Sequence, residues 1–166
     1  MNSPMTFTQP ICVGASLLLA VLAGHQPPPT TTLSGTLRAH VKDERFGIVT
    51  SVRGLPLGVR EALQTLFDTP SLDIAEPDAE FQATDVIATP RLPSRRLVAA
   101  GCSADHCLVY YERGGFVHTW FVTLFRWTPA ETRFEWGGAA PGGYASIGDV
   151  QKAVLSGEIK TASGSW

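Results

Sequence analysis

Residues 97–127 read LVAAGCSADHCLVYYERGGFVHTWFVTLFRW, and this stretch decides what fold the sequence predicts. Two strand-like runs, at 96–101 and 108–113, flank a short polar loop between two cysteines. A third run, at 116–127, is rich in the β-branched and aromatic residues that favour strands. Between the second and third runs, the glycine pair at 114–115 predicts a hairpin turn, because glycine takes positive φ angles without strain. The stretch therefore predicts an antiparallel β-meander.

Two helices are predicted outside this meander. Residues 57–67 place their apolar side chains on one helical face, and Pro70 ends the helix because proline disfavours helical geometry in the residue before it. Residues 146–155 begin at Ser146 with the spacing of a capping box and end before Gly157. Together with the meander, the two helices predict an α+β fold in which both helices pack on one face of an antiparallel sheet.

The remaining elements are shorter. The sequence predicts strands at 46–52, 81–88, 132–136 and 158–160, and a glycine-rich loop at 137–143. These assignments leave a single domain of ordinary size, with enough length to bury a core.

The first 36 residues predict export. Residues 11–24 form an unbroken apolar and small-residue run, too short to cross a bilayer comfortably but of the length of a signal-peptide core. We expect a signal peptide at 1–23, a Pro/Thr-rich tether at 24–36 and one domain at 37–166, in the periplasm or outside the cell. No Lys or Arg precedes the apolar run, so an uncleaved anchor is the alternative; after cleavage no membrane span is expected.

The cysteines predict a disulfide. Cleavage of the leader would remove Cys12 and leave Cys102 and Cys107 as a pair in an oxidising compartment. The alternative is a metal site that combines both thiols with His106 or Asp105. Zinc sites usually space paired cysteines more tightly, and the sequence has no second Cys/His pair, so we expect no metal and no cofactor.

The charge pattern argues against nucleic acid as a partner. The formal net charge is −2, and no basic patch occurs. Between Arg60 and Arg91 the chain carries seven acidic residues and no Lys or Arg. This interval predicts a solvated surface; the alternative is an acidic face that attracts a basic partner.

The loop within the cysteine pair is the predicted partner-binding site. Its residues are Ser103, Ala104, Asp105 and His106. A disulfide would hold these residues rigid, which suits recognition, although Asp105 and His106 could instead only bond the loop backbone.

The other histidines carry weaker expectations. His118 is expected to be a satisfied core or sheet histidine, and His25 and His40 to be exposed in or near the tether. The sequence contains neither a nucleophile elbow nor a His-Glu-x-x-His motif, so catalysis is not predicted.

Both faces of the strand at 116–127 are apolar, and one face needs a cover besides the helices. A loop or a second subunit would supply it, so a homodimer is one hypothesis. The aromatic residues on this sheet also leave open a small secreted hydrolase or ligand-binding module, and a structural envelope protein is a third class.

The chain resembles the inhibitor of vertebrate lysozyme family over residues 97–160. The resemblance rests on an exported chain of this size with a strand, a Cys-x4-Cys loop bearing His and Asp, further antiparallel strands and a late helix. The family loop reads Cys-Lys-Pro-His-Asp-Cys, whereas this loop reads Cys-Ser-Ala-Asp-His-Cys. Asp105 therefore occupies the place of the family histidine, and His106 the place of its aspartate.

The resemblance implies a function for the loop. In the family, the disulfide-closed loop enters the lysozyme cleft and its histidine reaches the catalytic carboxylates. We therefore expect an exported binding protein whose partner is a lysozyme-like muramidase. The exchange of Asp105 and His106 redirects both side chains and would set an anionic group against those carboxylates.

Overall fold

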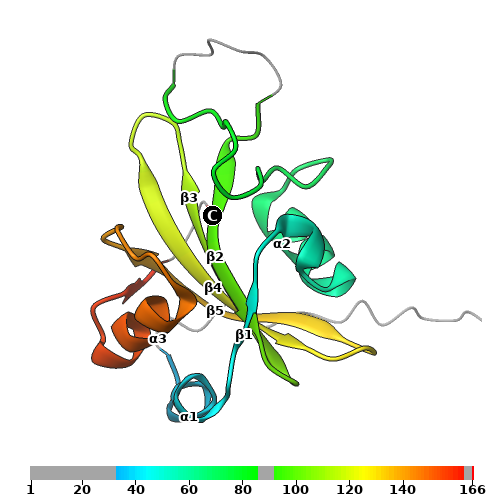
Figure 1. Cartoon of the computed structure of the whole chain (residues 1–166), viewed down its shortest axis with the longest axis vertical. Coiled ribbons are helices and arrows are strands. Elements are labelled where there is room, and N and C mark those ends of the chain that lie inside the picture. The colour runs from blue at the N-terminus through cyan, green and yellow to red at the C-terminus, as the bar shows by residue number, and fades with distance from the viewer. Residues whose placement is uncertain (1–32, 86–91, 163–165) are drawn as a thin grey trace, which may run out of the picture.

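The computed structural model describes residues 33–85, 92–162 and 166, and its centre is a six-stranded antiparallel sheet. The order of the strands in the sheet follows their order in the chain (Figure 1). The strands are β1 (Gly47–Val49), β2 (Arg95–Cys102), β3 (His106–Arg113), β4 (Thr119–Trp127), β5 (Thr132–Ala140) and β6 (Lys160–Thr161). The helices are α1 (Gly35–Asp43), the short 3-10 helix η1 (Val52–Gly54), α2 (Leu57–Phe67) and α3 (Ile147–Ser156). The α+β class and the antiparallel meander are confirmed.

The helices cover both faces of the sheet, which corrects the prediction of two helices on one face. In Figure 1, α2 lies on one side of the sheet, and α1 and α3 lie on the other. Successive side chains of β3 point to opposite faces, so Val109 and Tyr111 join the core under α2, whereas Leu108 and Tyr110 join the core under α3. All four side chains are fully buried. A sheet that is apolar on both faces needs cover on both, and three helices of one chain provide it.

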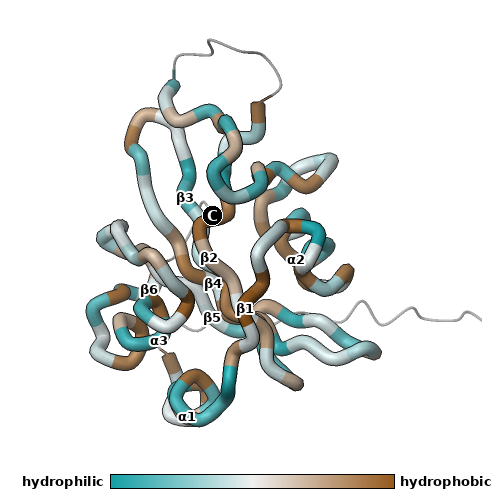
Figure 2. Tube along the Cα trace, in the orientation of Figure 1, coloured by the Kyte–Doolittle hydropathy of each residue, from teal (hydrophilic) through white to brown (hydrophobic). Residues whose placement is uncertain are grey.

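The second apolar face, which suggested a homodimer, is thus covered within the chain by α1 and α3. Figure 2 shows hydrophobic residues running through the middle of the sheet between the helices. The homodimer stays a prediction, but the apolar sheet face that suggested it is not exposed.

The α1 helix has a weak sequence signal. Ser34 caps it by accepting a hydrogen bond from the Leu37 amide, and Val41 is its one fully buried residue. The helix begins at Gly35, so the last two residues of the range predicted as tether belong to it. The predicted signal peptide and residues 24–32 of the tether lie outside the described residues. Within the described residues, no helix is long and apolar enough to cross a membrane.

The predicted glycine-rich loop at 137–143 is partly wrong, because β5 continues to Ala140. A β-carbon on Gly137 would lie 2.3 Å from the ring of Trp166, and one on Gly138 would lie 2.7 Å from Ile159. These two glycines let Trp166 and Ile159 pack closely against β5. Close approach of a neighbouring group is one of the ordinary reasons for glycine in a sheet.

The remaining predicted elements are confirmed, several with shifted ends, except the strand predicted at 81–88. The helix predicted at 57–67 is α2, and the one predicted at 146–155 is α3, with Ser146 as its N-cap and Gly157 at its end. The strand predicted at 116–127 begins only at Thr119, and Phe116 is 93% exposed in the β3–β4 turn. Of the strand predicted at 81–88, Thr84 forms a single bridge to Gly115, and 86–88 lie outside the described residues.

Candidate functional site

Cys102 and Cys107 form the predicted disulfide at the end of the β2–β3 hairpin. The two residues are also direct partners in the register of the strands, so the disulfide closes the turn at residues 103–105. We call residues 102–107 the tip. The predicted loop is therefore a tight, cross-linked hairpin turn.

Hydrogen bonds hold the tip in one conformation. The Ser103 amide donates to the His106 carbonyl (2.7 Å), and the His106 amide donates to the Ser103 hydroxyl (3.0 Å). The Trp127 amide donates to the Asp105 carbonyl (2.7 Å), which ties the tip to the end of β4. The tip is thus held by hydrogen bonds within its own residues and by one hydrogen bond from β4.

The four residues predicted to bind a partner divide into two pairs. Ala104 and Asp105 are exposed, whereas Ser103 is half-buried and His106 is 2% exposed. His106 is the first residue of β3 and points to the same face as Leu108, under α1. In this structure Ala104 and Asp105 can meet a partner at the tip, and His106 faces the interior.

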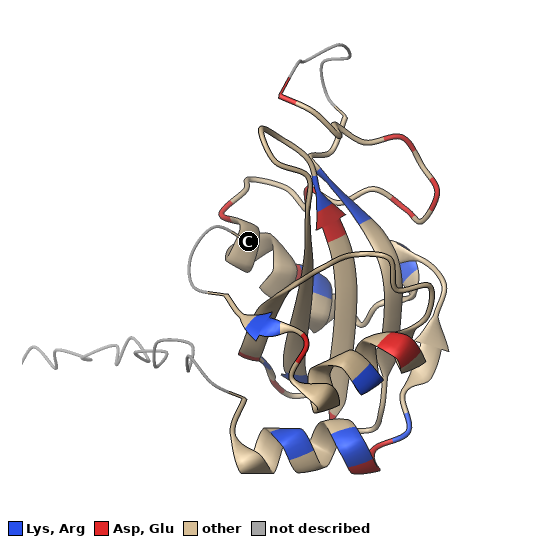
Figure 3. Ribbon diagram, turned by 90° about the vertical axis from the view of Figure 1, so that its left-hand side faces the viewer, with Lys and Arg blue, Asp and Glu red and all other residues tan. Residues whose placement is uncertain are grey.

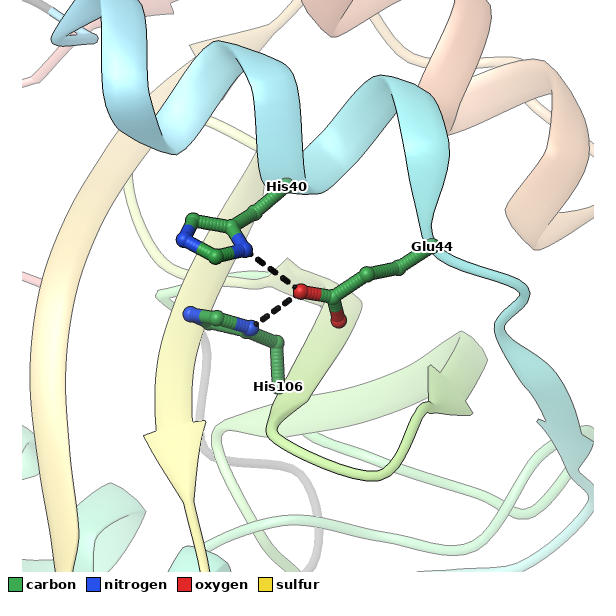
Figure 4. A group of neighbouring side chains, drawn as sticks. All are labelled: His40, Glu44 and His106. Atoms are coloured by element: carbon green, nitrogen blue, oxygen red, sulfur yellow. Dashed lines mark hydrogen bonds and ion pairs between the residues drawn. The ribbon is translucent and has the colours of Figure 1, made fainter.

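His106 lies in a cluster with His40 of α1 and with Glu44, the C-cap residue of that helix (Figure 4). The Nδ1 atoms of His40 and His106 lie 2.7 Å and 2.8 Å from the same oxygen of Glu44, Oε1. The two imidazole rings lie face to face at a tilt, with centroids 4.4 Å apart. Both rings thus direct one nitrogen toward a single carboxylate oxygen.

Two further residues surround this cluster. Ser103 donates its hydroxyl hydrogen bond to the other Glu44 oxygen, Oε2. Glu135 approaches His106 from β5, and its Oε2 lies 3.3 Å from His106 Nε2, within ion-pair distance but without a hydrogen bond. The other oxygen of Glu135 accepts a hydrogen bond from Arg133 (2.8 Å).

The position of Glu135 is set by a β-bulge. Leu124 pairs with Trp136 and Phe125 with Phe134, so Glu135 is the extra residue on β5. Bulges re-aim side chains and occur often beside functional sites. Here the bulge brings a carboxylate to His106.

The neighbours of Glu44 lower its pKa. Partial burial acts to raise the pKa, but the hydrogen bonds from Ser103 and His40 and the charge and hydrogen bond of His106 outweigh it. Among the described residues, no Lys or Arg pairs with Glu44. Its negative charge is therefore stabilised by two imidazoles and a hydroxyl.

Sequence reasoning missed this cluster because it placed His40 in or near the tether. His40 lies instead on α1, with 41% of its side chain exposed. The spacing of His40 and Glu44 is i, i+4, which places both on one helical face and was the available signal. The partnership with His106 depends on where α1 packs, which the sequence pattern does not show.

A second histidine–carboxylate pair lies at the opposite end of the sheet. His118 Nε2 lies 2.7 Å from Glu112 Oε2, and Arg96 donates to Glu112 Oε1 (2.6 Å). The His118 ring stacks on Trp120, with centroids 4.4 Å apart. His118 has a hydrogen-bond partner, as predicted, but it lies just before β4 rather than in the sheet or core, and its side chain is 37% exposed.

A groove of about 950 Å³ runs between α2 and the β4–β5 turn. Its apolar lining includes Leu57, Leu66, Trp127, Phe134 and Trp166, and Glu61 and Glu131 add negative charge. Trp127 belongs to the groove lining and also bonds the tip, so groove and tip adjoin.

Comparisons of the chain with models of protein families, with curated proteins and with solved structures find no match. Function must therefore be argued from the residues themselves.

Proposed function

We propose that this chain is an exported binding protein that engages a protein partner through the end of the sheet that carries the tip and the groove. The observation that carries the proposal is the hydrogen bond from the Trp127 amide to the Asp105 carbonyl, because it joins the tip to the wall of the groove. A partner that contacts exposed Ala104 and Asp105 can therefore contact the groove as well.

The disulfide supports the export part of the proposal. Disulfides persist in oxidising compartments and are rare where thiols are kept reduced. Closing a six-residue segment removes little chain entropy compared with a long loop, so the bond between Cys102 and Cys107 serves mainly to hold the tip.

The rigidity of the tip supports a role in recognition. Binding costs less free energy when the contacting segment is ordered beforehand. The groove adds apolar surface beside the tip, and concave apolar surface with a few polar groups is typical of binding sites.

The charges at this end favour a basic partner. Asp105 is exposed at the tip, and Glu61 and Glu131 line the adjoining groove. The acidic residues on the loop that follows α2 lie toward the opposite end of the sheet, and the middle of the sheet carries almost no charge (Figure 3). An acidic surface speeds the association of a basic partner by long-range attraction.

The candidate partner is a lysozyme-like muramidase, which the family resemblance implies. Asp105 stands at the place of the family histidine, and it is also the exposed charged residue of this tip. Since a carboxylate would be repelled by catalytic carboxylates, we propose that Asp105 meets a basic surface of the partner.

A hydrolase or ligand-binding module on the aromatic sheet face has less support. Phe121, Phe125 and Trp136 are buried beneath the helices. The residues that line the groove include neither His106 nor His118, so no histidine stands ready for catalysis there.

The test is a binding assay with matched charge reversals. Immobilised chain with its disulfide intact is exposed to purified c-type lysozyme at low and moderate salt, and a cell-wall turbidity assay is run in parallel. We expect micromolar or tighter binding that Asp105→Arg weakens at least tenfold. Glu80→Arg makes the same charge change on the exposed segment near Gly115, at the opposite end of the sheet, and should leave binding nearly unchanged.

Two outcomes would count against the proposal. The muramidase part fails if no lysozyme class binds at micromolar concentration. The tip itself fails as the contact surface if Asp105→Arg and Glu80→Arg weaken binding equally.

A further inference from the structure

We propose that His40, Glu44 and His106 form a binding site for a zinc-like divalent cation. Figure 4 shows both imidazole rings and the carboxylate directed toward one another, between α1 and the start of β3. The site is distinct from the exposed surface of the tip, and it requires no partner protein.

The donor atoms already converge. One ligand atom from each of the three residues lies within 4.8 Å of the other two. Zinc binds nitrogen and oxygen ligands at about 2.0–2.2 Å, which sets tetrahedral ligands roughly 3.3 Å apart. The two Nδ1 atoms lie 2.7 Å and 2.8 Å from Glu44 Oε1, so these contacts need to open by only about 0.5 Å to admit the ion.

The protonation of the rings favours a cation between these atoms. Each imidazole nitrogen that faces Glu44 Oε1 must either carry a proton or share a metal ion with the oxygen. Without an ion, two rings must both direct N–H groups at one oxygen. A bound cation would take the place of both N–H groups, and each ring would then carry its single proton on Nε2, which is a neutral form that ligates metals.

The surroundings of the ligands match those of metal sites. A ligating histidine usually offers its second ring nitrogen to a carboxylate, which fixes the orientation of the ring. His106 Nε2 faces Glu135 Oε2 at 3.3 Å, and that buried oxygen has no hydrogen bond of its own. A small rotation would let Nε2–H donate to it. The Ser103 hydroxyl orients Glu44 in the same supporting way.

Access and charge are also suitable. His106 is buried, but His40 is 41% exposed, so the ion can enter beside His40 and a water molecule can complete a tetrahedral shell. No Lys or Arg among the described residues pairs with Glu44, so no protein cation competes for its charge.

The donor set selects the class of metal. Two imidazoles and one carboxylate suit zinc and its neighbours in the first transition row, whereas calcium prefers six to eight oxygen ligands. We therefore expect Zn²⁺ to bind and Ca²⁺ not to bind at similar concentration.

The experiment is a zinc titration of the untagged mature chain with its disulfide intact, in competition with a chromophoric zinc indicator. We expect one zinc per chain. His40→Ala changes a half-exposed helix residue and should weaken binding at least tenfold. Glu44→Gln keeps the shape of the side chain but removes its charge, and it should weaken binding to a similar degree. His118→Ala is the matched control, because His118 also contacts a glutamate, and it should bind zinc as the wild type does.

A melting experiment supplies a second readout. An excess of zinc about 100-fold above Kd should raise the Tm of the wild type by roughly 5–10 °C, and His40→Ala should lose this shift. Circular dichroism checks that each variant is folded. The proposal is overturned if the wild type binds no stoichiometric zinc at micromolar concentration, or if His118→Ala loses as much affinity as His40→Ala.

Discussion

The two ends of the sheet each hold a histidine against a glutamate, and they differ in what else meets the carboxylate. At the tip end, Glu44 receives His40 and His106 on one oxygen and a serine hydroxyl on the other. We call the opposite end of the sheet, which carries the β3–β4 turn, the hairpin end. There Glu112 contacts His118 through one oxygen and Arg96 through the other. The histidine–glutamate hydrogen bonds have nearly the same length at the two ends, 2.7 Å and 2.8 Å at the tip end and 2.7 Å at the hairpin end.

The two carboxylates differ in whether a permanent positive charge also contacts them. Arg96 carries a permanent positive charge and balances Glu112, so the hairpin end is a complete ion pair. In the part of the chain that the structure describes, no Lys or Arg pairs with Glu44, which faces two histidines and a serine hydroxyl instead. A histidine–glutamate contact is common to both ends. The other partners of each glutamate indicate which end can bind a ligand.

Replacing each histidine by alanine should give the largest difference between the two ends, measured as the loss in free energy of unfolding. His106→Ala removes a buried side chain and leaves Glu44 and Glu135 without it, so it should lower the free energy of unfolding by about 3 kcal/mol. His118→Ala removes a partly exposed ring and leaves Glu112 with Arg96, so about 1 kcal/mol or less is expected. Urea unfolding at neutral pH with a chelator present measures both values. Equal losses would show that the two ends are equivalent.

Removal of the disulfide should give the next largest effect. The double variant Cys102→Ser/Cys107→Ser opens a short loop and should cost about 2 kcal/mol in the chain-entropy estimate. Amide exchange should become faster at Ser103 and His106, because their mutual hydrogen bonds depend on the closed turn. Exchange at Gly114 in the opposite turn should stay unchanged. Faster exchange at both ends would mean that the disulfide stabilises the whole sheet and not the tip.

Alkaline titration should give the smallest effect, and it tests the buried middle of β3, which lies between the two ends. Burial raises the pKa of Tyr110 to about 12, and the negative charge of nearby Glu112 adds to the shift. The folded chain thus keeps a proton that the unfolded chain loses near pH 10, so stability is full below about pH 10 and falls as pH rises toward 12. Tyrosinate absorbance and urea unfolding across this interval measure the effect.

The control for this titration is Tyr110→Phe. The variant should lose less stability between about pH 9 and 11 than the wild type does, because the shifted group is gone. A titration of Tyr110 near pH 10 would contradict the buried position of its hydroxyl group.

The sequence predicted the elements whose signals are local. The α2 helix ends at Phe67, with Asp68 as its C-cap just before Thr69 and Pro70, and α3 begins after a Ser146 cap, so the sequence predicts both helices to within a residue or two. The meander followed from alternating apolar strands and the glycine turn at 114–115. The disulfide followed from the export signal and the even cysteine count.

What the sequence did not predict depends on packing between distant segments. Gly137 looked like a loop residue, because the Trp166 ring that needs the space is 29 positions away. His40 looked exposed, because its helix buries little and is held by contacts with the sheet and with α3. His106 looked like a loop residue, but the register of β3 turns it inward toward Glu44.

The decisive measurement for the proposed zinc site is a crystal structure of the chain grown with zinc, with anomalous diffraction measured on both sides of the zinc edge. We expect one strong anomalous peak about 2.0–2.2 Å from His40 Nδ1, His106 Nδ1 and a Glu44 oxygen, and none beside His118. No peak at the tip-end cluster, or a peak beside His118 and Glu112, would contradict the proposed site.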